Sequence, residues 1–306
     1  MSDEISDVLI VGSGPAGLQA AIHAVRKKVT VTVLGKPRRS SIYKAHVENY
    51  LGVDGVSLGS DLLDIGLNQA RRFGVEVIEA DLLNIEEDGT VFKAHIEDGR
   101  DLQARSVIFA TGTSRKKLKV KGEKELSGKG VSYCVDCDAN FYRGAKVAVV
   151  GNQSAAVDGA VTLTRYASEV HLVASKLEVS EQLRAELDKS PAQLHEGVWV
   201  KEIAGEQGVE ALLLDNDQRL AVEGVFVELG AKGAMDLATI LGVALDSETF
   251  SYITTNKKQE TNIPGVYAAG DIAGPPWQMA KAVGEGCVAG WEAANHVQAR
   301  KRGARK

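Results

Sequence analysis

The sequence predicts an α/β fold made of two Rossmann-like, three-layer domains, with the second domain inserted into the first. Two glycine-rich turns, at residues 12–17 and 151–156, each follow a short apolar run and precede a helix-forming segment. This order of strand, turn and helix is typical of dinucleotide-binding units. The second turn begins roughly 140 residues after the first, and a repeat of complete units at that distance favours two domains over one large sheet.

Both units contain the elements of a βαβ motif. In the first, residues 7–12 predict a buried strand, residues 15–27 a helix and residues 29–34 the next strand, with a further buried strand at residues 106–110. In the second unit, the corresponding strand, helix and strand are predicted at residues 146–151, 155–167 and 169–173.

The C-terminal part of the chain is expected to return to the first domain. Residues 264–271 predict a strand that closes on Gly270 and Asp271, and a helix follows from about residue 278 to residue 297. This strand has no βαβ unit of its own. We therefore expect a first domain made of residues 1–117 and 246–306, with residues 118–245 forming the inserted domain.

Composition excludes several classes of protein. The chain has 306 residues, a net charge of −5 and three cysteines. The negative charge argues against a general nucleic-acid binder, and three cysteines are too few for a secreted disulfide framework. No apolar run approaches the roughly 20 residues of a membrane helix, and the acidic N-terminus shows no signal peptide. We expect a soluble, cytoplasmic protein without a membrane partner.

The stretch Cys134-Val135-Asp136-Cys137-Asp138 is the most informative in the chain. Two thiols separated by two residues can close a small disulfide ring, and such pairs often have a lowered thiolate pKa. Half of a zinc site is an alternative, but it needs further ligands and the remaining cysteine, Cys287, is isolated. Two inert buried thiols are a second alternative. The acid directly after the second cysteine favours redox chemistry.

Together these features resemble the low-molecular-weight thioredoxin reductase family of FAD-dependent disulfide reductases, over nearly the whole chain. The resemblance is carried by the turn at residues 12–17, Ala110-Thr111-Gly112, the Cys134–Asp138 stretch, Gly270-Asp271, Gln278 and residues 284–287. It implies catalytic roles for Cys134, Cys137 and Asp138. Cys137 would face the flavin, Cys134 would attack the partner disulfide, and Asp138 would move the proton. The resemblance also implies a homodimer.

The same resemblance implies FAD as the cofactor. Its contacts would come from Gly12, Ser13, Gly14, Pro15, Ala16, Gly17, Asn49, Ala110, Thr111, Gly112, Gly270, Asp271, Gln278, Met279 and Ala280. The three glycines of the first turn permit close approach to a pyrophosphate, and the family's aspartate at position 271 bonds the flavin ribitol. One departure is that the second strand ends at Gly35, without an acid for the adenosine ribose.

The second turn departs further from the family pattern. Its middle position is Gln153, where a glycine would let the backbone touch a pyrophosphate. The loop after residue 173 lacks the expected histidine and arginines, and Lys176 is its only cation. The Pro-Asn pair expected after Gly230 is missing, and Trp277 replaces an arginine. These changes predict a lost or altered nicotinamide site. We expect no metal site, because Cys287 is isolated from the other two cysteines.

We therefore expect flavin-dependent reduction of a protein disulfide, with thioredoxin as acceptor and a donor other than NADPH. Reduced ferredoxin is the leading donor. Basic clusters at residues 115–121 and 300–306 could steer such an acidic partner. The alternatives are a dithiol oxidase that uses oxygen, an ordinary NADPH-dependent thioredoxin reductase, and a non-catalytic flavin redox sensor.

Overall fold

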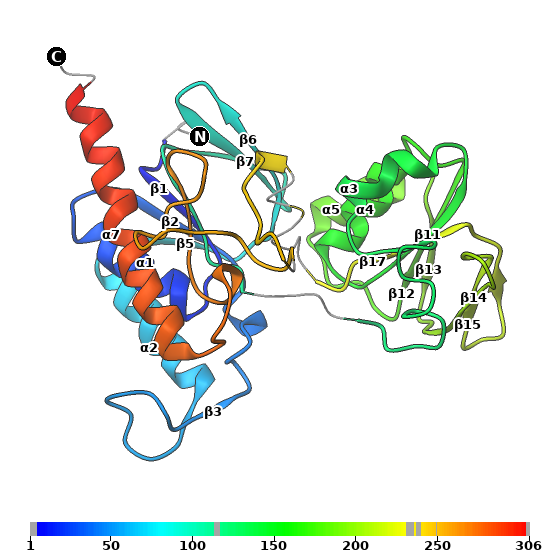
Figure 1. Ribbon diagram of the computed structural model, residues 1–306, viewed down its shortest axis with the longest axis horizontal. Helices are drawn as coiled ribbons and strands as arrows, with labels where there is room; N and C mark the ends of the chain where they lie inside the picture. The colour runs from blue at the N-terminus through cyan, green and yellow to red at the C-terminus, as the bar shows by residue number, and fades with distance from the viewer. Residues whose placement is uncertain (1–4, 113–116, 231–235, 237–239, 249, 304–306) are drawn as a thin grey trace. The chain divides into compact units, whose positions relative to one another are not determined.

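A computed structural model describes residues 5–112, 117–230, 236, 240–248 and 250–303 (Figure 1). The chain divides into two compact units. The first comprises Met1–Ile96, Asp101–Thr113 and Ile240–Lys306, and the second comprises Glu97–Arg100 and Ser114–Thr239. Each unit contains its own five-stranded parallel sheet, which confirms the predicted class of two Rossmann-like α/β domains.

The sheet of the first unit has the strand order β18-β9-β1-β2-β5. Its strands are β1 (Val8–Val11), β2 (Val31–Leu34), β5 (Glu76–Ile78), β9 (Val107–Phe109) and β18 (Val266–Ala268). All four residues of β1 are buried, as expected for a central strand of a parallel sheet that is covered on both faces. The C-terminal strand β18 pairs with β9, so the chain returns to its first sheet.

Two helices pack tightly beside this sheet, α1 (Pro15–Val25) and α7 (Met279–Gly303) (Figure 1). A Cβ on Gly286 would lie 2.2 Å from the carbonyl oxygen of Ala16, and one on Gly290 would lie 2.1 Å from that of Ala20. Such distances leave no room for a side chain, so these two glycines set the close approach of the helices.

The remaining elements of the first unit surround this core. They are η1 (Pro37–Arg39), β3 (His46–Val47), β4 (Ser57–Leu58), α2 (Gly59–Arg72), β6 (Leu82–Asp88), β7 (Val91–Ile96), β8 (Asp101–Ala104) and η3 (Asp271–Ala273). Strands β6, β7 and β8 form an antiparallel meander, and β3 pairs with β4.

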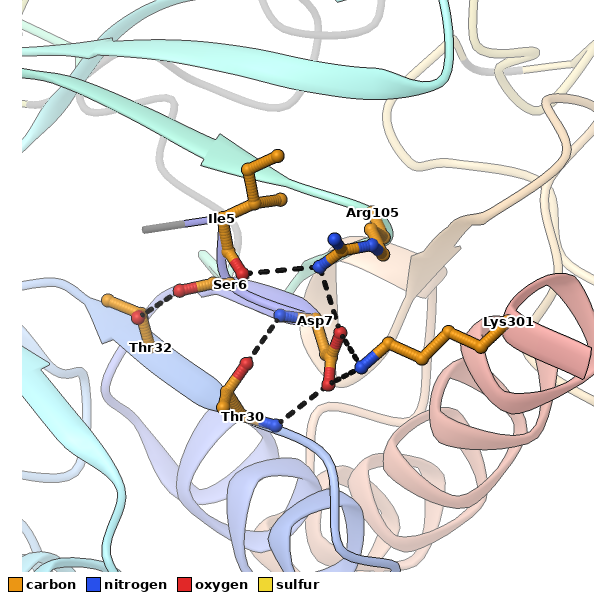
Figure 2. Close-up of polar contacts among 7 residues, drawn as sticks. All are labelled: Ile5, Ser6, Asp7, Thr30, Thr32, Arg105 and Lys301. Carbon is orange, nitrogen blue, oxygen red and sulfur yellow. Dashed lines mark hydrogen bonds and ion pairs between the residues drawn. The ribbon is translucent and has the colours of Figure 1, made fainter. Parts of the chain in front are cut away.

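Asp7, directly before β1, ties the C-terminal helix to the sheet (Figure 2). Its carboxylate is 2% exposed and accepts hydrogen bonds from Arg105 at 3.1 Å and from Lys301 at 2.7 Å. The backbone amide of Thr30 also donates to it, at 3.1 Å. Lys301 therefore anchors the last turns of α7, which runs six residues beyond the predicted end at residue 297.

The sheet of the second unit has the order β10-β17-β11-β12-β13. Its strands are β10 (Val131–Ser132), β11 (Lys146–Val150), β12 (Glu169–Ala174), β13 (Gln193–Glu196) and β17 (Gly224–Val227). The helices are α3 (Val135–Asp138), η2 (Ala139–Tyr142), α4 (Ser154–Leu163) and α5 (Glu181–Lys189). A small antiparallel sheet, β14 (Val200–Ala204), β15 (Ala211–Leu214) and β16 (Arg219–Leu220), completes this unit. Among the described helices of both units, none combines the length and the apolar character needed to cross a bilayer.

Candidate active site

The first glycine-rich turn joins β1 to α1 and is shaped by close backbone contacts. A Cβ on Gly12 would meet the carbonyl oxygen of Ala110 at 2.2 Å, and one on Gly17 would meet the carbonyl oxygen of Gly12 at 1.8 Å. Gly14 differs, because the nearest atom to its Cβ would be Ser40 Oγ at 3.2 Å. Gly12 and Gly17 are thus required by packing, whereas the missing side chain of Gly14 keeps the mouth of the turn open.

The same turn presents the N-terminus of α1. Gly14 occupies the N-cap position without a side-chain hydrogen bond, and Pro15 is the first helical residue. Backbone amides at an uncapped helix N-terminus point outward, and the helix dipole favours an anion there. This turn therefore fits the pyrophosphate of a dinucleotide such as FAD.

A second cofactor segment lies where β18 ends. Asp271 is half-buried, and burial raises the pKa of its carboxyl group while the charge of Lys281 opposes that shift. No residue in the described part of the chain donates a hydrogen bond to this carboxylate. A half-buried carboxylate without a donor from the protein can accept a hydrogen bond from a ligand hydroxyl, as the predicted ribitol contact requires.

The remaining predicted cofactor residues come together in the first unit from distant parts of the chain. Asn49 donates a hydrogen bond to Gln278 at 3.2 Å, across 229 positions of sequence. Met279 and Ala280 open α7, and Thr111 and Gly112 follow β9. At Gly270, a Cβ would lie 2.9 Å from the Cβ of Ala16, so the β18 turn packs against the first turn of α1.

The end of β2 carries positive charge, where an acidic residue would be expected to bind the adenosine ribose of the cofactor. Gly35 stands at the end of the strand, and Lys36 and Arg39 follow it. Both cations pair with the buried carboxylate of Asp81, at 3.2 Å and 2.6 Å. The acid near this strand end thus comes from a separate segment of the chain.

The second unit contains a disulfide between Cys134 and Cys137, with a Cα–Cα distance of 5.4 Å. Cys134 is buried at 6% exposure and Cys137 is more accessible. The backbone amide of Cys137 donates to Cys134 Sγ at 3.1 Å. An amide in this position would stabilise a thiolate on Cys134 when the pair is reduced.

Asp138 is held in place by a residue that sequence reasoning missed. Ser132, on β10, donates its hydroxyl proton to Asp138 Oδ2 at 2.6 Å and accepts from the backbone amide of Cys134 at 3.2 Å. The serine therefore connects the proposed proton carrier to the backbone of the first cysteine. The available signal was a hydroxyl residue inside a short buried strand, two positions before the cysteine.

Two further acids near the disulfide were also missed. Glu228 follows β17, is 8% exposed and accepts a hydrogen bond from the Val135 amide at 3.1 Å. Asp236 is 6% exposed, and one of its carboxylate oxygens lies within 4.8 Å of the sulfur atoms of both cysteines. They share a small pocket with Val135, Asp136, Ala155, Asp158 and Gly159. The sequence signal for Glu228 was an acid at the carboxyl end of an apolar strand.

The second glycine-rich turn joins β11 to α4 and is closed by the protein itself. Gln153 occupies the N-cap position of α4. The backbone amide of Ala155, in the first turn of α4, donates to the carbonyl oxygen of Gly230 at 3.3 Å. Asn152 exchanges two hydrogen bonds with Ser175, at 2.8 Å and 3.0 Å. Groups that could bind a pyrophosphate are thus engaged within the unit.

The loop after β12 is closed in a similar way. The carboxylate of Glu196 accepts from the Leu177 amide at 2.9 Å and pairs with Arg184 at 3.1 Å. These two contacts hold the pKa of Glu196 below its usual range, the Leu177 amide contributing most. Lys176 is exposed. A carboxylate of the protein therefore takes the amide and the cation that a ligand phosphate would otherwise use.

The other residues singled out in the sequence lie away from the contacts described above or outside the described residues. His171 is buried on β12 and hydrogen-bonds to His195 at 3.1 Å, consistent with a structural role. Trp277 is 65% exposed, and Cys287 lies half-buried in α7. Arg115, Lys116, residues 231–233 and residues 304–306 lie outside the described residues.

One open dinucleotide turn and a second Rossmann-like unit bearing a disulfide define the class of pyridine nucleotide-linked disulfide oxidoreductases. Residues 6–286 match the family described as pyridine nucleotide-disulphide oxidoreductase. A thioredoxin reductase from Listeria monocytogenes is 35% identical over 310 residues, covering 97% of this chain and 95% of the relative. The chain belongs to the thioredoxin reductase family.

Solved structures support the same assignment. The atypical thioredoxin reductase TRi from Desulfovibrio vulgaris Hildenborough is 30% identical, with a TM-score of 0.83 and coverage of 96% of this chain and 98% of that one. A ferredoxin-flavin thioredoxin reductase from Clostridium acetobutylicum is 32% identical, with a TM-score of 0.68 and coverage of 96% and 98%. The family supports FAD as the cofactor, as the resemblance implied.

Proposed function

We propose that this protein reduces the disulfide of a thioredoxin through Cys134 and Cys137, with electrons that reach FAD from a donor other than NADPH. The thioredoxin acceptor is supported by the names of the relatives. Bound FAD would supply the electron pair that opens the Cys134–Cys137 disulfide. We further propose that the protein acts as a homodimer, as the family resemblance implies, and that it works in the cytoplasm, as its composition led us to expect.

The protein's own residues would carry the exchange. The Cys134 thiolate attacks the acceptor disulfide and forms a mixed disulfide, and Cys137 then attacks Cys134 Sγ and releases the reduced acceptor. Asp138, fixed by its hydrogen bond from Ser132, moves a proton between solvent and the thiols. The Cys137 amide stabilises the attacking thiolate.

The closed second turn is the observation that carries the donor proposal. NADPH needs free amides for its pyrophosphate and cationic side chains for its 2′-phosphate. Here the Ala155 amide is used by Gly230, and the Leu177 amide and Arg184 are used by Glu196. The negative charge of Glu196 would also repel a phosphate. Ferredoxin is the proposed donor, supported by the likeness to a structure described as a ferredoxin-flavin thioredoxin reductase.

Anaerobic titration of the purified flavoprotein tests the donor. NADPH and NADH at millimolar concentration should leave the flavin oxidised for many minutes, whereas reduced ferredoxin, supplied in excess over the electrons that the flavin and the disulfide take up, should bleach it within the turnover time. Fast bleaching by micromolar NADPH would overturn the donor proposal and return the chain to the ordinary NADPH-dependent enzymes.

Two cysteine variants test the relay separately. Cys134→Ser and Cys137→Ser should each abolish thioredoxin reduction while leaving bound flavin unchanged, because the thiols lie in the second unit and the cofactor turn lies in the first. Substantial thioredoxin reduction by either variant would contradict the dithiol relay.

Rapid oxygen uptake by the wild-type protein with small dithiols would instead identify a dithiol oxidase, and bound flavin with no turnover would identify a sensor.

A further inference from the structure

The carboxylate of Asp236 lies beside the reacting sulfur atoms. One of its oxygens is within 4.8 Å of both Cys134 Sγ and Cys137 Sγ. Asp236 and Cys134 are each only 6% exposed. When the pair is reduced, a carboxylate at this distance from the two sulfur atoms can accept a proton from either thiol, directly or through one water molecule.

The surroundings of Asp236 favour proton exchange. Glu228, Asp136 and Asp158 line the same pocket, from the end of β17, from α3 and from α4. Glu228 is buried like Asp236, whereas Asp136 is exposed and Asp158 is half-buried, so carboxylates accessible to water line the same pocket. The Val135 amide donates a hydrogen bond to Glu228, so this wall of the pocket is tied to the first residue of α3.

We propose that Asp236 is a second catalytic acid–base residue, which serves thiol–disulfide exchange while Asp138 remains bound to Ser132. This inference rests on the proposed reduction of a protein disulfide but is independent of the electron donor. It also differs from a metal site, because a metal ligated by both sulfurs would block the disulfide that the cycle must form.

The proposed step balances in atoms and electrons. The Cys134 thiolate attacks one sulfur of the substrate disulfide, an S–S bond forms, and the other substrate sulfur leaves as a thiolate. Cys137 then gives its proton to Asp236 and attacks Cys134 Sγ, so the mixed disulfide breaks and the second substrate thiolate leaves. Protonated Asp236 returns the proton to that thiolate, and solvent protonates the first. The enzyme dithiol is oxidised and the substrate disulfide is reduced.

Single-turnover exchange tests this role without donor or thioredoxin. The full-length enzyme is reduced anaerobically with dithiothreitol, freed of excess reductant and mixed in a stopped-flow instrument with a small aromatic disulfide whose released thiolate absorbs visible light. Asp236→Asn should lower the rate constant of the resolving step at pH 7 by about 10² to 10⁴-fold. Asp217→Asn, which alters an exposed acid of the same unit, should leave it unchanged.

A conservative variant and a pH series separate catalysis from damage to the fold. Asp236→Glu should recover at least a tenth of the wild-type rate constant. The wild-type rate should decline at low pH through protonation of both the carboxylate and the attacking thiols, and Asp236→Asn should lose the carboxylate's part of this decline and keep the part due to the thiols. A wild-type rate and pH profile in Asp236→Asn would overturn the inference, and so would failure of Asp236→Glu to recover activity while its flavin and titratable thiols are intact. Those results would leave the donor titration and cysteine variants to judge the proposed function by themselves.

Discussion

At the scale of single residues, the two glycine-rich turns differ most at the N-cap of the following helix. Gly14 and Gln153 occupy this position in α1 and α4, and both have extended backbone conformations, with ψ of −171° and −173°. The backbone therefore follows a similar course in both turns. What separates an open phosphate site from a closed one is the side chain of Gln153 and the carbonyl that binds the Ala155 amide.

Two alanine substitutions distinguish the functions of the glycines in the first turn. Gly14→Ala should preserve the fold but lower the FAD content, because its Cβ contacts only Ser40 within the protein and would enter the pyrophosphate approach. Gly17→Ala should unfold the first unit or greatly lower its melting temperature, because its Cβ would overlap the Gly12 carbonyl. Absorbance at the flavin band and thermal unfolding measure the two effects. A fully yellow Gly14→Ala protein would contradict the assignment of this turn.

Ser132 offers a second test at this scale. Ser132→Ala removes the hydrogen bond to Asp138 and leaves the Cys134 amide without its acceptor. We expect turnover to fall about ten-fold, a smaller loss than the roughly 10² to 10⁴-fold expected when a general acid–base group such as Asp138 is replaced in Asp138→Asn. Steady-state thioredoxin reduction measures both. The double variant should be no slower than Asp138→Asn, and fully additive losses would show that Ser132 does not act through Asp138.

At the scale of elements, long-range ion pairs fasten helices to sheets. The buried carboxylate of Asp7 joins β1, Arg105 and the last turns of α7 (Figure 2). The basic C-terminal cluster was predicted as a docking surface, but Lys301 is engaged with Asp7 within the fold. Lys301, near the end of the sequence, thus stabilises the first unit through its contact with Asp7, which lies 294 positions away in the chain.

Asp7→Asn should therefore destabilise the first unit. The amide can accept fewer of the bonds from Arg105, Lys301 and Thr30, and a weakened buried network of this kind costs about 1–3 kcal/mol. Urea unfolding followed by flavin fluorescence would measure the change. Asp54→Asn, which alters an exposed acid of the same unit, is the matched control and should have no effect.

The pair of His171 and His195 predicts a pH dependence for the second unit. Burial lowers the pKa of both rings, and for His171 the nearby charge of Glu169 only partly opposes this. The folded state therefore favours neutral rings, whereas the unfolded chain takes up protons near its ordinary pKa of about 6.5. Stability from this pair is present above that pH and is lost as the pH falls below it.

Thermal unfolding between pH 8 and pH 5 checks this. The melting temperature of the second unit should fall as the solution is acidified, and His195→Gln should flatten the dependence. His46→Gln, an exposed substitution in the first unit, should keep the wild-type slope. An unchanged slope in His195→Gln would exclude the pair as the cause.

At the scale of the whole molecule, the net charge of −5 coexists with local basic residues that could receive an acidic donor. Lys117 and Lys119 are exposed, whereas Lys121 pairs with Glu202 at 2.8 Å. Lys117→Glu should slow reduction by ferredoxin at low ionic strength, and the difference should vanish at high salt, because the screening length is only about 10 Å at 0.1 M. Lys257→Glu is the control. Salt-independent reduction would discard the basic docking surface but spare the donor.

Local patterns in the sequence determined the two Rossmann-like units, the redox pair and the open first turn. Each of these depends on residues close together in the chain: an apolar strand followed by spaced glycines, or two cysteines three positions apart. The return of the C-terminal segment to the first sheet was also predictable, because its strand lacked a unit of its own and β18 pairs with β9.

Only the tertiary structure decided which groups surround the disulfide and what closes the second turn. Glu228 meets Val135 across 93 positions, and Glu196 meets Leu177 from a different strand. These contacts exist because the sheet order places β17 beside β11 and β13 beside β12. No local sequence pattern specifies which strands are neighbours. The sequence alone therefore predicted a nicotinamide site missing its usual residues, whereas the fold revealed that the protein's own carbonyl and carboxylate groups occupy the hydrogen-bond donors of that site.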